Sequence, residues 1–162
     1  NAVHGLNFPE PERFATSGEY VPSLSGEGKM SKSVVGSYIS VLDDLPTIQK
    51  SLARAPTDSG TGVSEDMPVS VKNLLQLVEL FQGSQRRQEY EVLYTSSGIR
   101  YGDLKKELAQ AIYTELEPIQ QKYRELEKSS EYVEQVIAQG AGKARQITQQ
   151  TIDETKQAMG FG

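Results

Sequence analysis

The sequence lacks cysteine altogether and contains a single histidine, His4. Without cysteine the chain can form neither a disulfide nor a thiolate zinc site, and a reducing compartment fits this composition. Long apolar runs are missing too: no stretch approaches the length that a membrane-spanning helix needs, and no charged-plus-apolar leader opens the chain. We therefore expect a cytoplasmic protein without a membrane segment.

Charge is unevenly distributed along the chain, whose formal net charge is −5. Residues 1–70 hold five basic and nine acidic side chains, whereas residues 72–106 hold six basic and four acidic ones. The middle of the chain is therefore modestly basic. From charge alone this is typical of an ordinary solvated helix surface, since RNA-binding surfaces are usually more basic.

The first quarter of the chain predicts little regular structure. Residues 3–28 are rich in proline and glycine and lack periodicity, which is typical of loops belonging to a larger body. Residues 38–42 alternate and include β-branched side chains, so they predict a short strand. Asn1 and Ala2 look like the remnant of a removed expression tag, which suggests a chain cut from a longer protein.

Helices are expected over most of the remainder. Asp43 and Asp44 can cap a helix over residues 45–54, in whose first turn Pro46 is tolerated. A Gly/Ser/Asp-rich loop over residues 57–70 follows. Helical periodicity then predicts four further helices. The first runs from Val71 to Phe81 and is closed by Gly83, and the second is capped by Ser84, ends before Gly98 and has Tyr90 and Leu93 or Tyr94 facing inward. The third runs from Leu104 to Leu126, with Ile119 and Tyr123 on the same face and a kink at Pro118, and the fourth runs from Val133 to Ile152 after a Ser129-Ser130 cap.

Two glycines lie inside the last of these helices. Gly140 and Gly142 each cost a helix about 1 kcal/mol relative to alanine. The close approach of a neighbouring helix is the reason we expect for them, with a hinge or a ligand contact as the alternative.

One short motif carries chemistry. The run Lys29-Met30-Ser31-Lys32-Ser33, preceded by Gly26 and Gly28, resembles the second signature of class I aminoacyl-tRNA synthetases. With each residue near one in twenty of average usage, a chance match in this chain is on the order of one in ten thousand. The alternative is a solvated Ser/Lys/Gly turn of no functional consequence.

The resemblance assigns a role to each signature residue. Amino-acid activation expels pyrophosphate from ATP, and a preplaced ammonium group stabilises the charge that builds up on it. The family match implies that Lys29 and Lys32 bind the phosphates and that Lys32 is the main transition-state group. It further implies that the Met30 backbone lies near the adenine and that Ser31 and Ser33 assist. The glycines would let the loop open and close.

Downstream segments narrow the resemblance to the bacterial tryptophanyl-tRNA synthetases. The matching segments run in order along the chain: Pro22-Ser23-Leu24, Ile39 to Asp44, Ala55 to Ser59, Asn73-Leu74-Leu75, Tyr101 to Lys105, Leu116-x-Pro118-Ile119 with Tyr123, Gly140 to Ala144, and Met159-Gly160-Phe161. Val34 stands where the family usually has aspartate. The other catalytic signature, His-x-Gly-His, is absent, and we expect His4 to be a bystander.

This resemblance implies a mainly α fold: a helical anticodon-binding bundle preceded by an irregular or short-strand remnant of a Rossmann-type catalytic domain. The expected domains are residues 1–42, at the edge of the catalytic domain with the signature loop, and residues 43–162, the anticodon-binding domain. The implied parent is a dimeric ligase that joins L-tryptophan to tRNA(Trp), using ATP with Mg²⁺. Because the tryptophan pocket would lie largely outside this chain, we expect the chain to be inactive alone, and we expect no metal site of its own.

Single-stranded RNA bases are bound by aromatic rings, guanidinium planes and hydrogen bonds. The predicted RNA-binding residues are Arg86, Arg87, Arg100, Tyr101 and Lys105, with Tyr90 and Tyr94 nearby. The alternative is that the tyrosines are core or rim residues and that the arginines form surface ion pairs. Three other functions stay open at this point: a tyrosyl-tRNA synthetase fragment, a non-catalytic helical RNA-binding module, and a helical interaction protein with a fortuitous signature.

Overall fold

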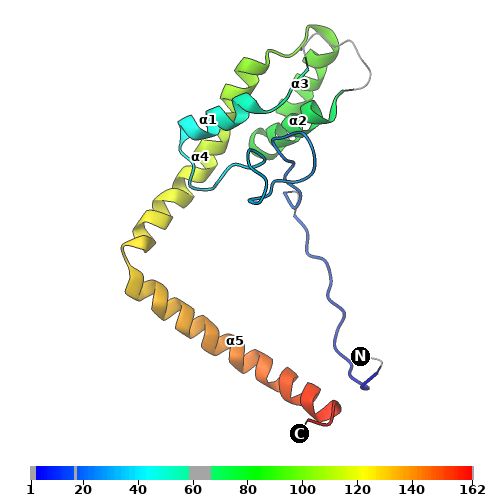
Figure 1. Ribbon diagram of the computed structural model, residues 1–162, viewed down its shortest axis with the longest axis vertical. Coiled ribbons are helices and arrows are strands. Elements are labelled where there is room, and N and C mark those ends of the chain that lie inside the picture. The colour runs from blue at the N-terminus through cyan, green and yellow to red at the C-terminus, as the bar shows by residue number, and fades with distance from the viewer. Residues whose placement is uncertain (1–2, 17, 59–66, 162) are drawn as a thin grey trace. The chain divides into compact units, whose positions relative to one another are not determined.

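The computed structural model describes residues 3–16, 18–58 and 67–161 (Figure 1). Within these residues the fold is mainly helical and the segment before the first helix is irregular, which confirms the predicted fold class. The helices are α1 (Leu45–Arg54), α2 (Val69–Gln82), α3 (Ser84–Ser96), α4 (Tyr101–Glu127) and α5 (Ser130–Ala158). The expected tag remnant and most of the expected loop over residues 57–70 lie outside the described residues.

The strand predicted over residues 38–42 is wrong. The only β-bridge within the described ranges joins Pro22 to Lys29. Residues 38–42 instead form an irregular stretch whose backbone groups bond side chains: the Ser40 N–H donates to the Asp43 carboxylate, 2.9 Å away. Alternating polarity creates a strand only where a second strand can pair with it, and here none does.

Helix α1 has the bounds that the sequence predicts. The Asp44 carboxylate accepts a hydrogen bond from the Thr47 N–H at 3.0 Å and so caps the first turn, in which Pro46 lies. Ile48 and Leu52 are fully buried and attach the helix to the core.

Helices α2 and α3 form an antiparallel pair joined by Gly83, whose φ of +90° permits the sharp reversal (Figure 1). α2 buries five residues: Val71, Leu74, Leu75, Leu77 and Val78. In α3 the buried residues are Tyr90 and Tyr94, whereas Leu93 is 39% exposed. The prediction of Ser84 as a side-chain cap is wrong, because Gly83 occupies the N-cap position and no side chain caps the helix.

Helix α4 carries one buried stripe at four-residue spacing. Leu104, Leu108 and Ile112 are buried, Leu116 packs against the core, and Gln120 continues the stripe. Ile119, which the sequence places on the core face, is 53% exposed because it lies one residue off this stripe. Pro118 lies inside the helix, as predicted.

The chain forms two compact units, residues 15–121 and residues 1–14 with 122–162. The first contains the core. The expected division into residues 1–42 and residues 43–162 stays a prediction. In the second unit, α5 buries none of its residues. Among the described residues, no atom outside the helix lies within 4 Å of the position that a Cβ would take at Gly140 or Gly142, so the expected close neighbour is not found there.

Candidate functional site

The signature loop begins at the end of a turn, residues 21–30, whose two ends are joined by backbone hydrogen bonds. The Ser23 N–H donates to the Gly28 carbonyl and the Met30 N–H donates to the Val21 carbonyl, each at 2.9 Å. Gly28 has a φ of +69°, in the left-handed region that favours glycine. The two segments on either side of the turn are therefore fixed to each other.

Ser37 closes the other side of the loop. It is buried, and its carbonyl accepts a hydrogen bond from the Leu24 N–H at 2.9 Å. Its hydroxyl lies 2.8 Å from the carbonyl oxygens of Ser31 and Val34, to which it can donate, and it accepts from the Ser31 N–H at 3.2 Å. One buried hydroxyl thus holds residues 31–37 in a compact turn, a role that nothing in the local sequence indicated.

The signature side chains divide into a partly buried and an exposed group. Met30 packs against the hydrophobic core, and its N–H is already used. Lys29, Lys32 and Ser33 are exposed, and neither lysine forms a hydrogen bond or an ion pair with the residues that the structure describes. Lys32 borders a cavity of about 340 Å³, which is also lined by Met30, Ser31, Tyr38, Ile39, Ser40 and Val41. The arrangement offers unpaired ammonium groups on a supported loop.

Side-chain amides from two helices donate hydrogen bonds to the backbone on either side of this loop. From α2, Asn73 Nδ2 donates to the Gly26 carbonyl at 3.1 Å. From α4, Gln120 is 3% exposed, and its Nε2 donates to the carbonyls of Val41 and Asp43, both at 2.9 Å. Neither amide was predicted from the sequence, because helical periodicity identifies the apolar side chains that face the core and gives no signal for a polar one on the same helix.

Gly26 is constrained as well as positioned. Its φ is +97°, and a Cβ at this residue would lie 3.3 Å from Pro56 Cγ. The expected freedom of this glycine to open and close the loop is therefore limited by its neighbours, and its positive φ and close packing give a sufficient reason for a glycine here.

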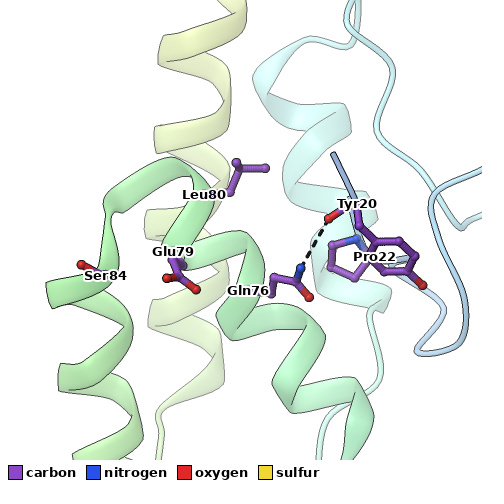
Figure 2. A pocket seen from close by; sticks show the side chains of 6 residues that line it. All are labelled: Tyr20, Pro22, Gln76, Glu79, Leu80 and Ser84. Atoms are coloured by element: carbon purple, nitrogen blue, oxygen red, sulfur yellow. Dashed lines mark hydrogen bonds between the residues drawn. The ribbon is translucent and has the colours of Figure 1, made fainter. Parts of the chain in front are cut away.

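A second cavity lies beside the turn (Figure 2). It measures about 280 Å³, and Gln76 Nε2 donates across one wall to the Tyr20 carbonyl at 3.4 Å. Its lining is completed by Pro22, Glu79, Leu80 and Ser84. The cavity has no cationic side chain in its lining, so it offers no positive charge to a phosphate group.

Two of the predicted RNA-binding residues form ion pairs. Arg86 contacts Glu89 at 2.6 Å and Glu107 at 2.5 Å, and its guanidinium carbon lies 4.7 Å from the centre of the Tyr90 ring. These contacts raise the pKa of Arg86, and Arg86 lowers the pKa of the Glu107 carboxyl. Arg87 likewise contacts Glu79 at 2.5 Å and Glu91 at 2.8 Å.

The other three predicted residues lie at the start of α4. The Arg100 side chain is 90% exposed, and its Nε lies 3.5 Å from Asp103 Oδ2, which makes this ion pair longer than those of the two α3 arginines. The Tyr101 hydroxyl donates to Asp58 Oδ1 at 2.6 Å. The pKa of Tyr101 is raised, mainly by burial and also by this hydrogen bond. Lys105 Nζ donates to the Ala55 carbonyl at 2.7 Å, and burial lowers the pKa of Lys105. The structure thus brings Tyr101 and Lys105 together and places Arg86 and Arg87 on α3.

Two absences hold for the described part of the chain. It contains no group of three or more His, Cys, Asp or Glu side chains that could hold a metal ion. In the same residues no helix combines the length and apolarity needed to cross a membrane.

Comparison with known proteins places these features in a family. The sequence model described as "tRNA synthetases class I (W and Y)" matches residues 1–117. The tryptophan–tRNA ligase of Porphyromonas gingivalis is 36% identical over 165 aligned residues, which cover 99% of this chain and 50% of that protein. The ligase of Halalkalibacterium halodurans is 39% identical over 83% of this chain and 41% of its own length. The ligase of Enterococcus faecalis is 35% identical over 97% and 47%, respectively. The chain therefore spans about half the length of the curated relatives that it matches.

Proposed function

The chain belongs to the family of class I tRNA synthetases for tryptophan and tyrosine, which confirms the family identified from its signature and downstream segments. On that premise we propose that it is the C-terminal half of a tryptophan–tRNA ligase. In this proposal the whole enzyme activates L-tryptophan with ATP and transfers it to tRNA(Trp). This half supplies the ATP-phosphate loop and the helices that bind the tRNA anticodon.

The observation that carries the proposal is the state of the two signature lysines. Lys29 and Lys32 are exposed and have no hydrogen-bond or ion-pair partner among the described residues, while the segments beside them are hydrogen bonded to α2 and α4. Two unpaired ammonium groups on a supported loop suit a ligand that brings its own negative charge. Both ammonium groups can therefore bind such a ligand without giving up a partner among the described residues.

The chemistry follows from this placement. The tryptophan carboxylate attacks the α-phosphorus of ATP, the bond from that phosphorus to the bridging oxygen breaks, and pyrophosphate leaves with the electron pair. Negative charge grows on the leaving oxygens, and an ammonium group contributes most when it stabilises this charge more than that of bound ATP. We assign this role to Lys32, and phosphate binding to Lys29, Lys32 and Ser33. The Mg²⁺ would enter with the ATP phosphates.

The tRNA-binding part of the proposal rests on the α3 and α4 residues. Arg100 is the most accessible of the predicted set, and Tyr101 and Lys105 line a cavity beside it. Arg86 and Arg87 can bind RNA only by exchanging carboxylate partners for phosphate, so we rank them below the residues of α4. The homodimer, the cytoplasmic compartment and the inactivity of the chain by itself remain parts of this proposal.

A substrate comparison tests the proposal. A full-length protein that carries this chain is assayed for exchange of labelled pyrophosphate into ATP with tryptophan, and with tyrosine as the matched control. We expect exchange that depends on tryptophan. Exchange that depends on tyrosine instead, or no exchange with either amino acid, would overturn the proposed function.

A further inference from the structure

A cavity of about 560 Å³ lies between α1 and the start of α4. Its polar lining consists of Gln49 and Lys50 from α1 with Tyr101, Lys105 and Lys106 from α4. Both wall segments lie in the compact unit of residues 15–121. The volume falls within the range of about 300–1,000 Å³ that is usual for small-ligand pockets.

The cavity is cationic in a chain whose net charge is negative. Three lysines line it and no acidic side chain does. The side chains of Lys50 and Lys106 form no hydrogen bond or ion pair with the described residues, whereas Arg86 and Arg87 on α3 each contact two carboxylates. Ammonium groups gathered around one cavity repel each other, and a bound anion removes this repulsion.

Lys105 differs from the other two lysines, because its ammonium group is hydrogen bonded to the backbone of the cavity wall. Its Nζ donates to the carbonyls of Ala53 at 3.3 Å and Ala55 at 2.7 Å, at the C-terminal end of α1. A cation is favourable at that end of a helix, where carbonyl groups lack partners within the helix. This contact fixes the end of α1 against α4 and keeps the two walls at a set separation.

The remaining lining suits a nucleobase better than a bare phosphate. The Tyr101 hydroxyl is bound to Asp58 at 2.6 Å, so the ring is held in place and its carbon surface is what it can offer a ligand. The Gln49 amide has no hydrogen-bond partner among the described residues, and it carries both donors and an acceptor. Aromatic rings that stack with bases and amides that bond their edges are the usual means of binding unpaired RNA.

We propose that this cavity binds one nucleotide of single-stranded RNA, with its phosphate between Lys50 and Lys106 and its base against Tyr101. Gln49 then bonds the edge of the base. The inference rests on the proposed tRNA-binding function and specifies where on the helical body one unpaired nucleotide is bound. Lys50, Lys106 and Gln49 are added to the residues that the sequence pointed to.

The test measures binding of a fluorescent tRNA(Trp) transcript to the chain over a range of salt concentrations. Each phosphate contact contributes about 0.7 to the slope of log affinity against log salt for single strands. We expect Lys50→Gln and Lys106→Gln each to weaken binding, and the double variant to reduce the slope by about that amount. Tyr101→Leu should weaken binding about fivefold or more through loss of stacking. Lys143→Gln, on the exposed surface of α5, is the matched control.

The outcomes separate this inference from the function on which it rests. If the unmodified chain binds the transcript and the Lys50 and Lys106 variants keep its affinity and salt slope, the cavity is not a nucleotide site, although the proposed function stands. If the unmodified chain does not bind the transcript, the tRNA-binding function and the cavity assignment fail together. A blunt RNA duplex that competes as well as a single strand of the same length would indicate binding through phosphates alone and would overturn the nucleotide pocket.

Discussion

The side-chain amide of Asn73 lies 3.1 Å from the carbonyl oxygen of Gly26, to which it donates a hydrogen bond. This contact joins α2 to the turn that supports the signature loop, across 47 residues of sequence. It attaches the loop to the helical body at a point where the backbone itself has little freedom.

Replacing Asn73 tests the strength of that attachment. We expect Asn73→Ala to lower the free energy of unfolding of the chain by about 1 kcal/mol, the usual net value of one hydrogen bond. Urea unfolding measures it. Gln76→Ala is the matched control on the same helix, because its bond to the Tyr20 carbonyl is longer, at 3.4 Å, and exposed. An equal or larger loss at Gln76 would contradict the importance given to Asn73.

Gln120 should contribute more than Asn73 to the free energy of unfolding, because it is buried and donates hydrogen bonds to two carbonyls. Gln120→Leu keeps a similar volume and leaves the Val41 and Asp43 carbonyls without their donor, which costs about 1–3 kcal/mol. Chemical denaturation gives the value, with Gln110→Leu on the exposed side of α4 as control. A loss at Gln120 no greater than at Gln110 would mean that water satisfies both carbonyls.

Two glycines are expected to respond in opposite directions to alanine. Gly26→Ala should destabilise the chain by about 1–2 kcal/mol, because its φ is +97° and Pro56 lies close to the position of the new methyl group. Gly142→Ala lies in a helix with open space around it and should stabilise the chain by about 0.5–1 kcal/mol. Thermal unfolding compares them. A stabilising Gly26→Ala would show that the turn is not held as described.

The ion pair of Glu107 with Arg86 predicts a pH dependence. Arg86 lowers the pKa of Glu107 below its ordinary value of 4.5 in the folded chain. A group whose pKa is lowered by folding contributes stability above its unfolded pKa, and this contribution disappears as the pH falls through the folded pKa. The difference in unfolding free energy between the native chain and Glu107→Gln should therefore be constant near pH 7 and shrink below about pH 4.5. A difference that does not change down to pH 3 would exclude this pair as its cause.

The sequence predicted the helices well because their signals are local. The bounds of α1 follow from Asp44, Pro46 and Pro56, which act on the residues next to them. The strand expected over residues 38–42 failed for the opposite reason. Alternation is local, but pairing depends on distant groups, and here the Val41 carbonyl bonds Gln120, 79 residues away.

The two signature lysines could be identified from the sequence, but the residues that hold their loop in place could not. The signature run identified Lys29 and Lys32, and the structure leaves both exposed. The buried hydroxyl of Ser37 had no sequence signal, since serine in a loop is expected at the surface. On α3, the spacing of Arg87 and Glu91 predicts a contact within the helix, but the contact of Arg86 with Glu107 depends on how α3 meets α4.

Substitution of Lys32 tests the central claim most directly. In a full-length protein that carries this chain, Lys32→Ala is compared with Lys128→Ala, an exposed lysine beyond α4, in tryptophan-dependent exchange of pyrophosphate into ATP. Loss of one group that stabilises transition-state charge lowers kcat by about 100-fold or more. We predict such a loss for Lys32→Ala, with the KM for tryptophan unchanged and Lys128→Ala equal to the native protein. Near-native kcat in Lys32→Ala would contradict the assignment of this loop to the ATP phosphates.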